Sequence, residues 1–360
     1  MVAPESVPPR GPSHVSRPRA PRVISPTRVD ATEPPPFTGA WAPDDTRLDD
    51  AIVFRLPAGS APEDVVLDSE GRLVAGGDDG TLWRWPAGCA DADDPDTVRP
   101  EAIANTGGRP LGVEVDPRDG TLIVCDAYRG LLRIGHDGAV TDLAARVAGT
   151  PILFCNNAAV AADGTVFFSD SSTRYPLSAW KRDLLEHRPN GRLLRYDPSD
   201  GSVDVVAEGL YFPNGVALTP DERAVMVVET TTHRLLRVPL VGEDVGGAAQ
   251  EILDLAAYPD NMSAVGDGTY WIALPSPRLP VAEKMLPHPG VRRVVALLPD
   301  KIQPKPGRYG LVALVDGDGT VLRTVHGPAG RYSMITGVRQ YGSTLWLGSL
   351  TEPGVARIAV

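Results

Sequence analysis

A unit of short apolar strands and tight polar turns recurs six times between about residue 52 and the C-terminus. In each copy one apolar strand leads through a turn, often Asp/Glu-Gly, to a second strand, as in Thr165-Val166-Phe167-Phe168. A third strand carries a Leu-Leu-Arg-like tetrad. The tetrads lie at 82–85, 131–134, 193–196, 235–238, 321–324 and 355–358. Most copies are separated by roughly 40 to 60 residues, which is typical of a β-propeller. We therefore predict an all-β fold, a six-bladed β-propeller with a central channel.

Two insertions and a leader depart from the repeat. Residues 175–190 interrupt the third blade, and residues 276–308 precede the tetrad of the fifth. Within the second insertion, 291–298 is predicted to form a short helix before the last blade, which either caps the central opening or packs on the rim. We expect both insertions near the channel mouth. Residues 1–37 are rich in Pro and Arg, which predicts a disordered leader whose end can lie along the body. Residues 38–360 form the predicted catalytic propeller domain.

Composition excludes several functional classes. A net charge of -11 without clustered Lys and Arg argues against a nucleic-acid partner. The three cysteines, Cys89, Cys125 and Cys155, are too few and too far apart for a disulfide framework or a thiolate metal site, so we predict free buried thiols. No apolar run approaches the roughly 20 residues that span a bilayer, and the leader has no apolar signal core. We therefore expect no membrane anchor and a cytoplasmic location.

Four oxygen-bearing side chains share one position, seven residues before an acidic turn residue. They are Glu63, Asn156, Asn214 and Asp260, and the turn residues are Glu70, Asp163, Asp221 and Asp267. By the same spacing, Gly112 and Met334 occupy this position in the second and sixth blades. Because equivalent strands of a propeller surround one axis, we expect the four oxygens to converge and bind a hard cation. A lone Asn or Asp at a strand start more often caps a turn, but four at one spacing favour the metal site.

Oxygen ligands with two negative charges favour Ca²⁺, with Mg²⁺ or Mn²⁺ as alternatives, over Zn²⁺. The neighbouring Asn157 and Asn261 are alternative or additional donors. A metal here would polarise a carbonyl of a small-molecule substrate, and Asp260 is the candidate general base or nucleophile. Since Ca²⁺ polarises less than Zn²⁺, activated lactones and aryl esters suit the site better than amides.

Other catalytic motifs are absent from the sequence, including Gly-x-Ser-x-Gly, His-Glu-x-x-His, a phosphate loop and Cys-x-x-Cys. His233 either assists proton transfer at the channel mouth or is an ordinary solvated loop histidine. Asp126 and Asp170, each at the end of a second strand, are interpreted as residues that hold blade turns.

Several motifs resemble the strictosidine synthase-like family, especially its adipocyte plasma membrane-associated protein branch. This family is grouped with the senescence marker protein/gluconolactonase and paraoxonase propellers. The resembling segments are 109–113 (RPLGV), 125–132 (CDAYRGLL), 168–172 (FSDSS), 212–218 (FPNGVAL), 228–231 (VETT) and 258–261 (YPDN). The resemblance implies a six-bladed propeller and, as in the hydrolytic members, a calcium ion in the channel. It implies the same ligands, Glu63, Asn156, Asn214 and Asp260, with Asn261 as a fifth donor and Asp260 as base or nucleophile.

Three features depart from the family pattern. Leu111 stands where paraoxonases carry a catalytic histidine, and Ser333 stands where plant strictosidine synthases carry the glutamate used for condensation. The leader also lacks the hydrophobic anchor of the membrane-associated relatives. We therefore predict a metal-dependent hydrolase of lactones or aryl esters. The alternatives are a strictosidine synthase-like condensing or cyclising enzyme and a non-catalytic propeller that binds a partner on its rim.

Overall fold

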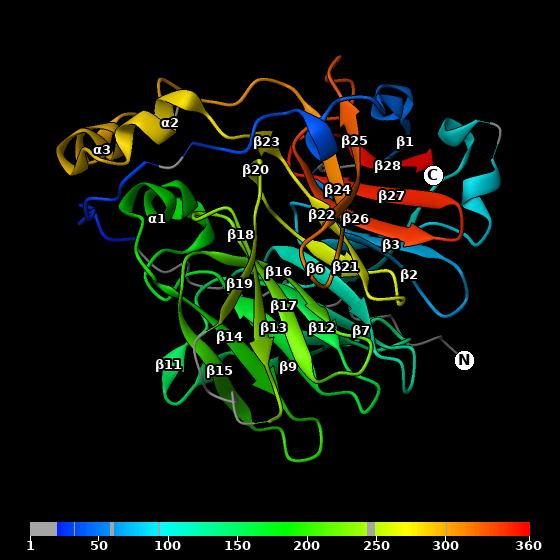
Figure 1. Cartoon of the computed structure of the whole chain (residues 1–360). Coiled ribbons are helices and arrows are strands. Elements are labelled where there is room, and N and C mark those ends of the chain that lie inside the picture. Colours follow the sequence, from blue (N-terminus) through cyan, green and yellow to red (C-terminus); the bar gives the residue numbers. More distant parts are fainter. Residues whose placement is uncertain (1–19, 32, 58–60, 93, 243–248, 300) are drawn as a thin grey trace, which may run out of the picture.

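Six four-stranded antiparallel sheets surround a common axis in the part of the chain that the structure describes (Figure 1). The structure is a computed structural model that describes residues 20–360 except 32, 58–60, 93, 243–248 and 300. Residues 1–19 of the predicted leader lie outside the described residues. The prediction of a six-bladed β-propeller is confirmed.

Each blade is described from its innermost strand outward. Blade 1 comprises β2 (Val65–Leu67), β3 (Leu73–Gly76), β4 (Thr81–Arg84) and β5 (Glu101–Asn105). Blade 2 comprises β6 (Pro110–Val115), β7 (Leu122–Asp126), β8 (Gly130–Ile134) and β9 (Val140–Ala144). Blade 3 comprises β12 (Cys155–Val160), β13 (Val166–Asp170), β14 (Gly191–Tyr196) and β15 (Val203–Leu210).

Blade 4 comprises β16 (Pro213–Leu218), β17 (Ala224–Glu229), β18 (Arg234–Pro239) and β19 (Gln250–Asp254). Blade 5 comprises β21 (Met262–Ala264), β22 (Thr269–Ala273), β24 (Gly310–Asp316) and β25 (Val321–Gly327). Blade 6 comprises β26 (Ile335–Tyr341), β27 (Thr344–Ser349), β28 (Gly354–Ala359) and β1 (Ile52–Arg55). Two small hairpins pair β10 (Arg146–Val147) with β11 (Thr150–Pro151) and β20 (Ala257–Tyr258) with β23 (Ser276–Pro277).

The propeller closes because the first strand of the chain completes the last blade. β1 pairs antiparallel with β28, with Phe54 opposite Val355. The inner strands then contact one another around the ring, in the order β2, β6, β12, β16, β21, β26 and back to β2. Since both faces of each inner sheet are covered by neighbouring blades, the middle strands read as continuous apolar runs rather than as alternating ones. In β17, for example, every residue is buried.

The sequence prediction assigned one strand of the fifth blade incorrectly. The tetrad at 321–324 was assigned to the third strand, but it lies in β25, the fourth strand of that blade. The third strand is β24, which pairs with β22 and places Val312 opposite Ala273. In β24, Leu314 stands opposite Trp271, where the other third strands carry their arginine, and it is half-buried as those arginines are. The strand therefore lacks the residue by which the other third strands were recognised.

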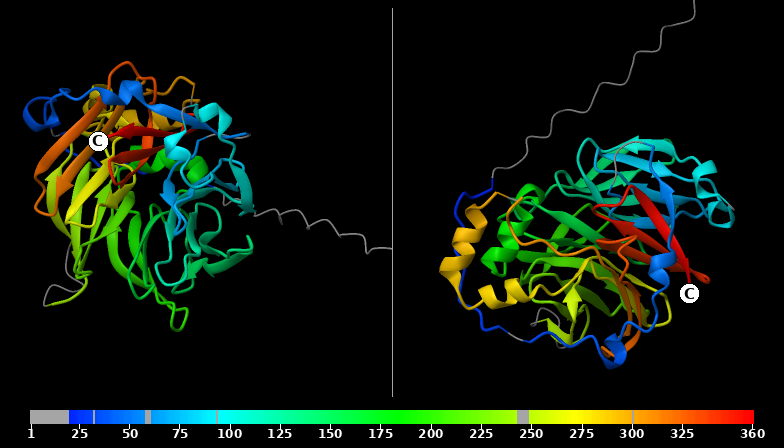
Figure 2. Two further views of the ribbon diagram at one scale, coloured as in Figure 1. Left: turned by 90° about the vertical axis from the view of Figure 1, so that its right-hand side faces the viewer. Right: turned by 90° about the horizontal axis from the view of Figure 1, so that it is seen from above.

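The two insertions contain the helices. α1 (Trp180–Glu186) follows the 3-10 turn η5 (Leu177–Ala179) in the third blade, and α2 (Pro280–Met285) and α3 (Pro289–Leu297) lie between β22 and β24. The predicted short helix before the last blade is therefore confirmed. α3 packs against α1 and α2, at the edge of the molecule in the view from above (Figure 2, right). The remaining 3-10 turns are η1 (Gly39–Trp41), η2 (Arg47–Asp50), η3 (Cys89–Asp91) and η4 (Pro95–Thr97).

None of the helices in the described ranges is long and apolar enough to cross a membrane. The three cysteines are free and buried, as predicted.

Closure by β1 is open to a direct test. Phe54 is fully buried and packs on Trp346 with ring centroids 5.3 Å apart, whereas Ile52 of the same strand is 37% exposed. We expect Phe54→Ala to lower the free energy of unfolding by about 3–5 kcal/mol, because it leaves a cavity between blades 6 and 1. Ile52→Ala should cost less than about 1 kcal/mol. Urea denaturation of both variants measures the difference, and equal losses would contradict the assigned role of β1.

Candidate functional site

Each blade has one structurally equivalent residue near the start of its inner strand. In blades 2, 3, 4 and 6 this residue follows, by two positions, the residue whose backbone carbonyl accepts a hydrogen bond from the N–H at or just beyond the end of the second strand. These bonds run from Ala127 N to Arg109 O, Ser171 N to Phe154 O, Thr230 N to Phe212 O and Leu350 N to Met334 O. In blades 1 and 5 it lies two residues before Val65 and Met262, which pair with the second strand. The six channel positions are therefore Glu63, Leu111, Asn156, Asn214, Asp260 and Thr336.

The four predicted ligand residues thus occupy four of the six channel positions, contributed by blades 1, 3, 4 and 5. The predicted occupants of the other two blades, Gly112 and Met334, are wrong by one and two residues. The reason is turn length. The turn after β6 is longer, and the turn after β26 is shorter, than the turns after β12 and β16. Gly112 instead allows close approach of neighbouring inner strands, because a Cβ there would lie 2.8 Å from the backbone of Asn156.

Hydroxyl groups at the ends of the second strands hold the two asparagines. Asn156 Nδ2 donates to Ser171 Oγ at 2.9 Å, and Ser171 Oγ donates in turn to the Pro213 carbonyl of the next blade at 2.7 Å. Blade 4 repeats the arrangement, with Asn214 Nδ2 donating to Thr230 Oγ1 at 3.3 Å and Thr230 Oγ1 donating to the Pro259 carbonyl at 2.8 Å. Because each amide nitrogen is engaged with a hydroxyl, each amide oxygen is left for another partner.

Four oxygens of this ring are buried without a hydrogen-bond partner in the protein. They are Glu63 Oε2, Asn156 Oδ1, Asn214 Oδ1 and Asp260 Oδ1. A buried polar atom left unpaired costs about 1–3 kcal/mol, so four in one ring indicate a site that a ligand completes. Two carboxylates and two amide carbonyls are the donor types that a hard divalent cation such as Ca²⁺ prefers. The described residues contain no cluster of three or more His, Cys, Asp or Glu side chains suited to a metal, so a cation here would depend on the asparagines.

The two carboxylates repel each other in this buried setting. Glu63 is 4% exposed and Asp260 8% exposed. Burial raises the pKa of Glu63 to about 7, although the nearby Arg109 charge opposes this shift. Burial, followed by the charge of Glu63, raises the pKa of Asp260 well above its usual range, and a hydrogen bond with Asn214 opposes the rise. A bound dication would offset both the cost of burying the two carboxylates and the repulsion between them.

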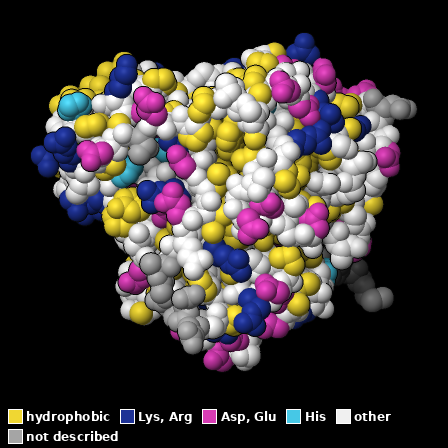
Figure 3. Space-filling model, viewed as in Figure 1, with side chains coloured by type: hydrophobic (Ala, Val, Ile, Leu, Met, Phe, Trp, Pro, Cys, Tyr) yellow, Lys and Arg dark blue, Asp and Glu magenta, His cyan; other side chains and the backbone are white. Residues whose placement is uncertain are grey.

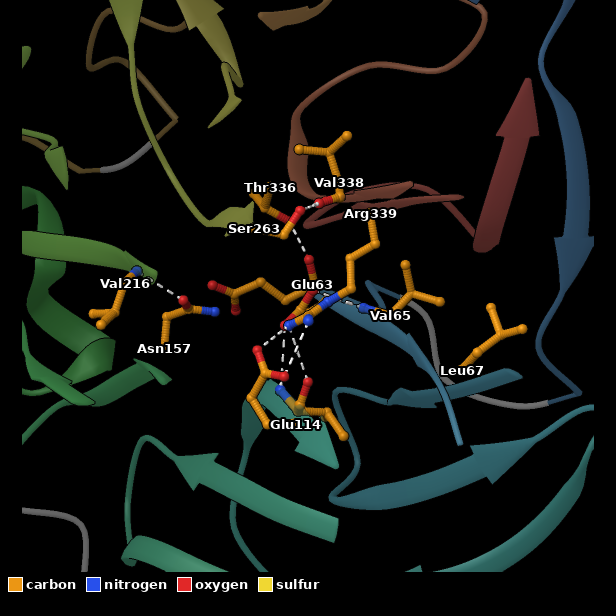
Figure 4. Close-up of polar contacts among 12 residues, drawn as sticks. Glu63, Val65, Leu67, Glu114, Asn157, Val216, Ser263, Thr336, Val338 and Arg339 are labelled. Atoms are coloured by element: carbon orange, nitrogen blue, oxygen red, sulfur yellow. Dashed lines mark hydrogen bonds and ion pairs between the residues drawn. The ribbon is translucent and has the colours of Figure 1, made fainter. Parts of the chain in front are cut away.

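The two neighbouring asparagines, Asn157 and Asn261, differ in role. Asn157 Oδ1 accepts a hydrogen bond from Val216 N at 2.9 Å, so Asn157 ties blade 3 to blade 4 (Figure 4). Asn156 is the residue of this pair whose amide oxygen has no hydrogen-bond partner. Asn261 is buried, and neither its Oδ1 nor its Nδ2 has a protein partner. Its backbone N–H donates to the Thr336 carbonyl at 2.9 Å, which fixes the start of blade 5 against blade 6. Asn261 therefore remains available as a fifth donor.

An ion-pair network that the sequence analysis missed lies beside Glu63. Arg339 of β26 is paired with Asp64 at 3.1 Å and with Glu114 of β6 (Figure 4). Burial raises the pKa of Glu114, and the Arg339 charge opposes that shift. The network joins the three consecutive blades 6, 1 and 2. A charged residue inside an otherwise apolar inner strand was the available sequence signal.

His233 is buried rather than solvated, so the interpretation as an ordinary loop histidine is wrong. Its ring stacks edge-on against Tyr258 with centroids 4.6 Å apart, and its Nε2 lies 3.8 Å from Glu283 Oε1. Burial lowers its pKa well below the usual value, which keeps the imidazole neutral.

Asp126 and Asp170 hold blade turns, as predicted. Asp126 accepts hydrogen bonds from Tyr128 N and Arg129 N, and Asp170 from Leu153 N and Phe154 N.

Two family models match parts of the chain, and several known proteins are 30–35% identical to it. The family described as "Strictosidine synthase-like, N-terminal" matches residues 39–85, and "Strictosidine synthase" matches residues 156–243. The adipocyte plasma membrane-associated protein of Danio rerio is 35% identical over 266 residues, covering 71% of this chain and 64% of that protein, so the match spans less than two thirds of the relative. The same-named protein of Mus musculus is 30% identical over 94% of this chain and 84% of its own. Protein STRICTOSIDINE SYNTHASE-LIKE 7 of Arabidopsis thaliana is 33% identical over 82% of this chain and 78% of its own.

Solved structures share the fold at lower identity. A gluconolactonase from Xanthomonas campestris aligns with a TM-score of 0.61 and 19% identity, covering 96% of this chain and 99% of that one. The calcium-binding protein regucalcin from Agrobacterium tumefaciens aligns with a TM-score of 0.58 and 15% identity, covering 86% and 92%. These structures support the propeller architecture, while the sequence relatives decide the family. The chain belongs to the strictosidine synthase-like family.

Proposed function

We propose that this protein is a Ca²⁺-dependent hydrolase of lactones or aryl esters. The observation that carries the proposal is the ring of four buried, unpartnered oxygens from Glu63, Asn156, Asn214 and Asp260. Asn261 would supply a fifth donor. The likeness of the fold to a gluconolactonase and to a calcium-binding regucalcin supports the same assignment.

When bound, the cation would polarise the substrate carbonyl and offset the charge of the two carboxylates. The chain's own part in the reaction centres on Asp260. Acting as general base, Asp260 takes a proton from water as the water oxygen attacks the carbonyl carbon, and returns it to the leaving alkoxide or phenoxide as the C–O bond breaks. Direct attack by the Asp260 carboxylate on the carbonyl carbon is the alternative, with water then cleaving the acyl-enzyme.

Arg109 is positioned to assist. It is buried, its Nη2 donates to the Ala61 carbonyl at 2.6 Å and lies 4.0 Å from Glu63 Oε2, and its Nη1 has no protein partner. A buried donor left free beside the reacting centre suits an oxygen on which negative charge develops.

The condensing alternative rests on a separate observation at Ser333. In place of the glutamate expected in plant strictosidine synthases, Ser333 Oγ donates to Glu352 Oε1 at 3.0 Å. Glu352 therefore places a carboxylate near that position. It is also paired with Arg308 at 2.6 Å, so its carboxylate is already engaged and we rank condensation second.

Calorimetric titration of the metal-free protein with Ca²⁺ tests the site itself. We expect about one ion per chain, because the four free oxygens form one ring. Glu63→Gln and Asp260→Asn should each weaken binding more than about tenfold, since each removes one of two ligand charges. Asp267→Asn, in an exposed turn, is the matched control and should bind as the native chain does. Unchanged affinity in both ligand variants would exclude this site.

Turnover of phenyl acetate and γ-lactones tests the chemistry. We expect chelation to abolish hydrolysis and added Ca²⁺ to restore it. Asp260→Ala should lower kcat/KM by roughly 10²–10⁴-fold, the usual contribution of a general base. Initial rates before and after chelation measure both effects. Full activity in the chelated protein or in Asp260→Ala would overturn the hydrolase assignment, and loss of amine–aldehyde condensation in Glu352→Gln alone would favour the second candidate.

The stability of the metal-free protein should depend on pH through Glu63. The usual pKa of a glutamate is 4.5 and burial raises the pKa of Glu63 to about 7, so between these values the folded state holds a proton that the unfolded state has released. The resulting stability is present below about pH 4.5 and is lost as pH rises through 7, an effect of about 3 kcal/mol. In chelator, Glu63→Gln should lose less stability between these pH values than the native chain. Parallel pH profiles from thermal denaturation would contradict the assigned burial of Glu63.

A further inference from the structure

Exposed apolar side chains concentrate on one surface. Among the described residues, nine large apolar side chains are exposed, and six of them lie on the insertion helices, the chain just after α3 and the chain before residue 30. We call this the α3 surface, and its exposed apolar residues are Val23, Val281, Val291, Val294, Leu297 and Ile302. Val294 and Leu297 are 61% and 67% exposed. An apolar group of this kind on the surface of an acidic protein indicates a contact surface.

The α3 surface is firmly attached, so its exposure does not reflect a loose helix. Arg292 is buried and donates to the carbonyls of Leu185 in α1 and Thr27 in the N-terminal segment. Ile24 packs in one cluster with Tyr175 and Ala296. The opposite face of α3 is thus fixed to the protein, and Val291, Val294 and Leu297, at positions i, i+3 and i+6, share the outward face.

Charge on these helices is sorted by sign. Their acidic residues, Asp183, Glu186 and Glu283, are all buried. Lys284 and Arg293 are exposed, and Lys301 and Lys305 follow in exposed positions. In a chain of net charge -11 these four exposed cations are a local concentration of positive charge. Figure 3 shows Lys and Arg side chains beside apolar ones at its upper left, with some acidic side chains among them.

We propose that the α3 surface docks on an anionic lipid bilayer. An amphipathic helix with apolar residues outward and a basic rim lies in the plane of the membrane interface, with its apolar side chains among the acyl chains. The basic rim attracts acidic headgroups. A second copy of this chain suits the surface less well, because the two basic rims would repel each other.

Docking there would bring the channel mouth close to the lipid. The segment that leads into α1 and α1 itself pack through Leu177, Trp180 and Leu184 on an apolar cluster that contains Phe154 and Phe212. Phe154 and Phe212 each lie two residues before a channel asparagine. Because α3 packs on α1, the α3 surface lies on the side of the molecule where the inner strands of blades 3 and 4 begin. A substrate dissolved in the membrane could therefore enter the channel beside it.

Sedimentation with vesicles tests the proposal without any need for activity or added calcium. The full chain is mixed with phosphatidylcholine vesicles that contain about 30 mol % phosphatidylserine, and with pure phosphatidylcholine vesicles. We expect binding to the anionic vesicles, weakened at about 1 M salt where charges are screened within about 3 Å. The double variant Val294→Glu/Leu297→Glu should bind at least about tenfold more weakly, since it removes the apolar contact. Leu322→Glu, at an equally exposed position on β25, should bind as the native chain does.

Three results would overturn the proposal. The first is no binding of the native chain to anionic vesicles. The second is binding that survives Val294→Glu/Leu297→Glu, which would mean that the basic residues alone attract the lipid. The third is a native dimer, seen by light scattering, that the double variant dissociates, which would show a second copy on this surface. Circular dichroism checks that both variants fold, which we expect of the double variant because Glu is favourable in an exposed helix.

Discussion

The pairing of β1 with β28 is the interaction on which the channel depends. It joins residues 52–55 to residues 354–357 and so closes six sheets into a ring. Only in a closed ring do the starts of the inner strands face one another, because each blade is placed by its two neighbours. Short hydrogen bonds between blades then fix the details, such as Thr336 Oγ1 to the Glu63 carbonyl at 2.9 Å. The closed ring thus brings six residues that are far apart in the sequence together around the channel.

The side chains that meet in the channel reduce the stability of the fold that brings them together. Glu63 and Asp260 are buried close enough for the charge of Glu63 to raise the pKa of Asp260, and four ring oxygens have no hydrogen-bond partner in the protein. Such an arrangement costs stability, and stability given up at one point of a well-packed domain is typical of a functional site. Nearby, Arg339 neutralises Asp64 and Glu114, so the remaining negative charge is concentrated on the ring itself. A hard dication would offset that charge.

Much of this could be predicted from the sequence because a propeller repeats. The Asp/Glu-Gly turns and apolar strands predicted six blades, and a fixed spacing from the turn selected Glu63, Asn156, Asn214 and Asp260. The same spacing failed for Leu111 and Thr336, because their turns differ in length and length is what a spacing rule assumes. The third strand of blade 5 was missed because Leu314 replaces the arginine that marks the other third strands. Interactions set by three-dimensional packing, such as His233 on Tyr258 or Arg339 across three blades, leave little trace in a linear pattern.

The most direct test of this account is diffraction from crystals grown with Ca²⁺ or a lanthanide substitute, with an anomalous map used to locate the ion. We predict one strong peak in the channel at about 2.3–2.6 Å from oxygens of Glu63, Asn156, Asn214 and Asp260. A channel that holds only water between these four side chains, with the ion bound elsewhere or not at all, would contradict the account.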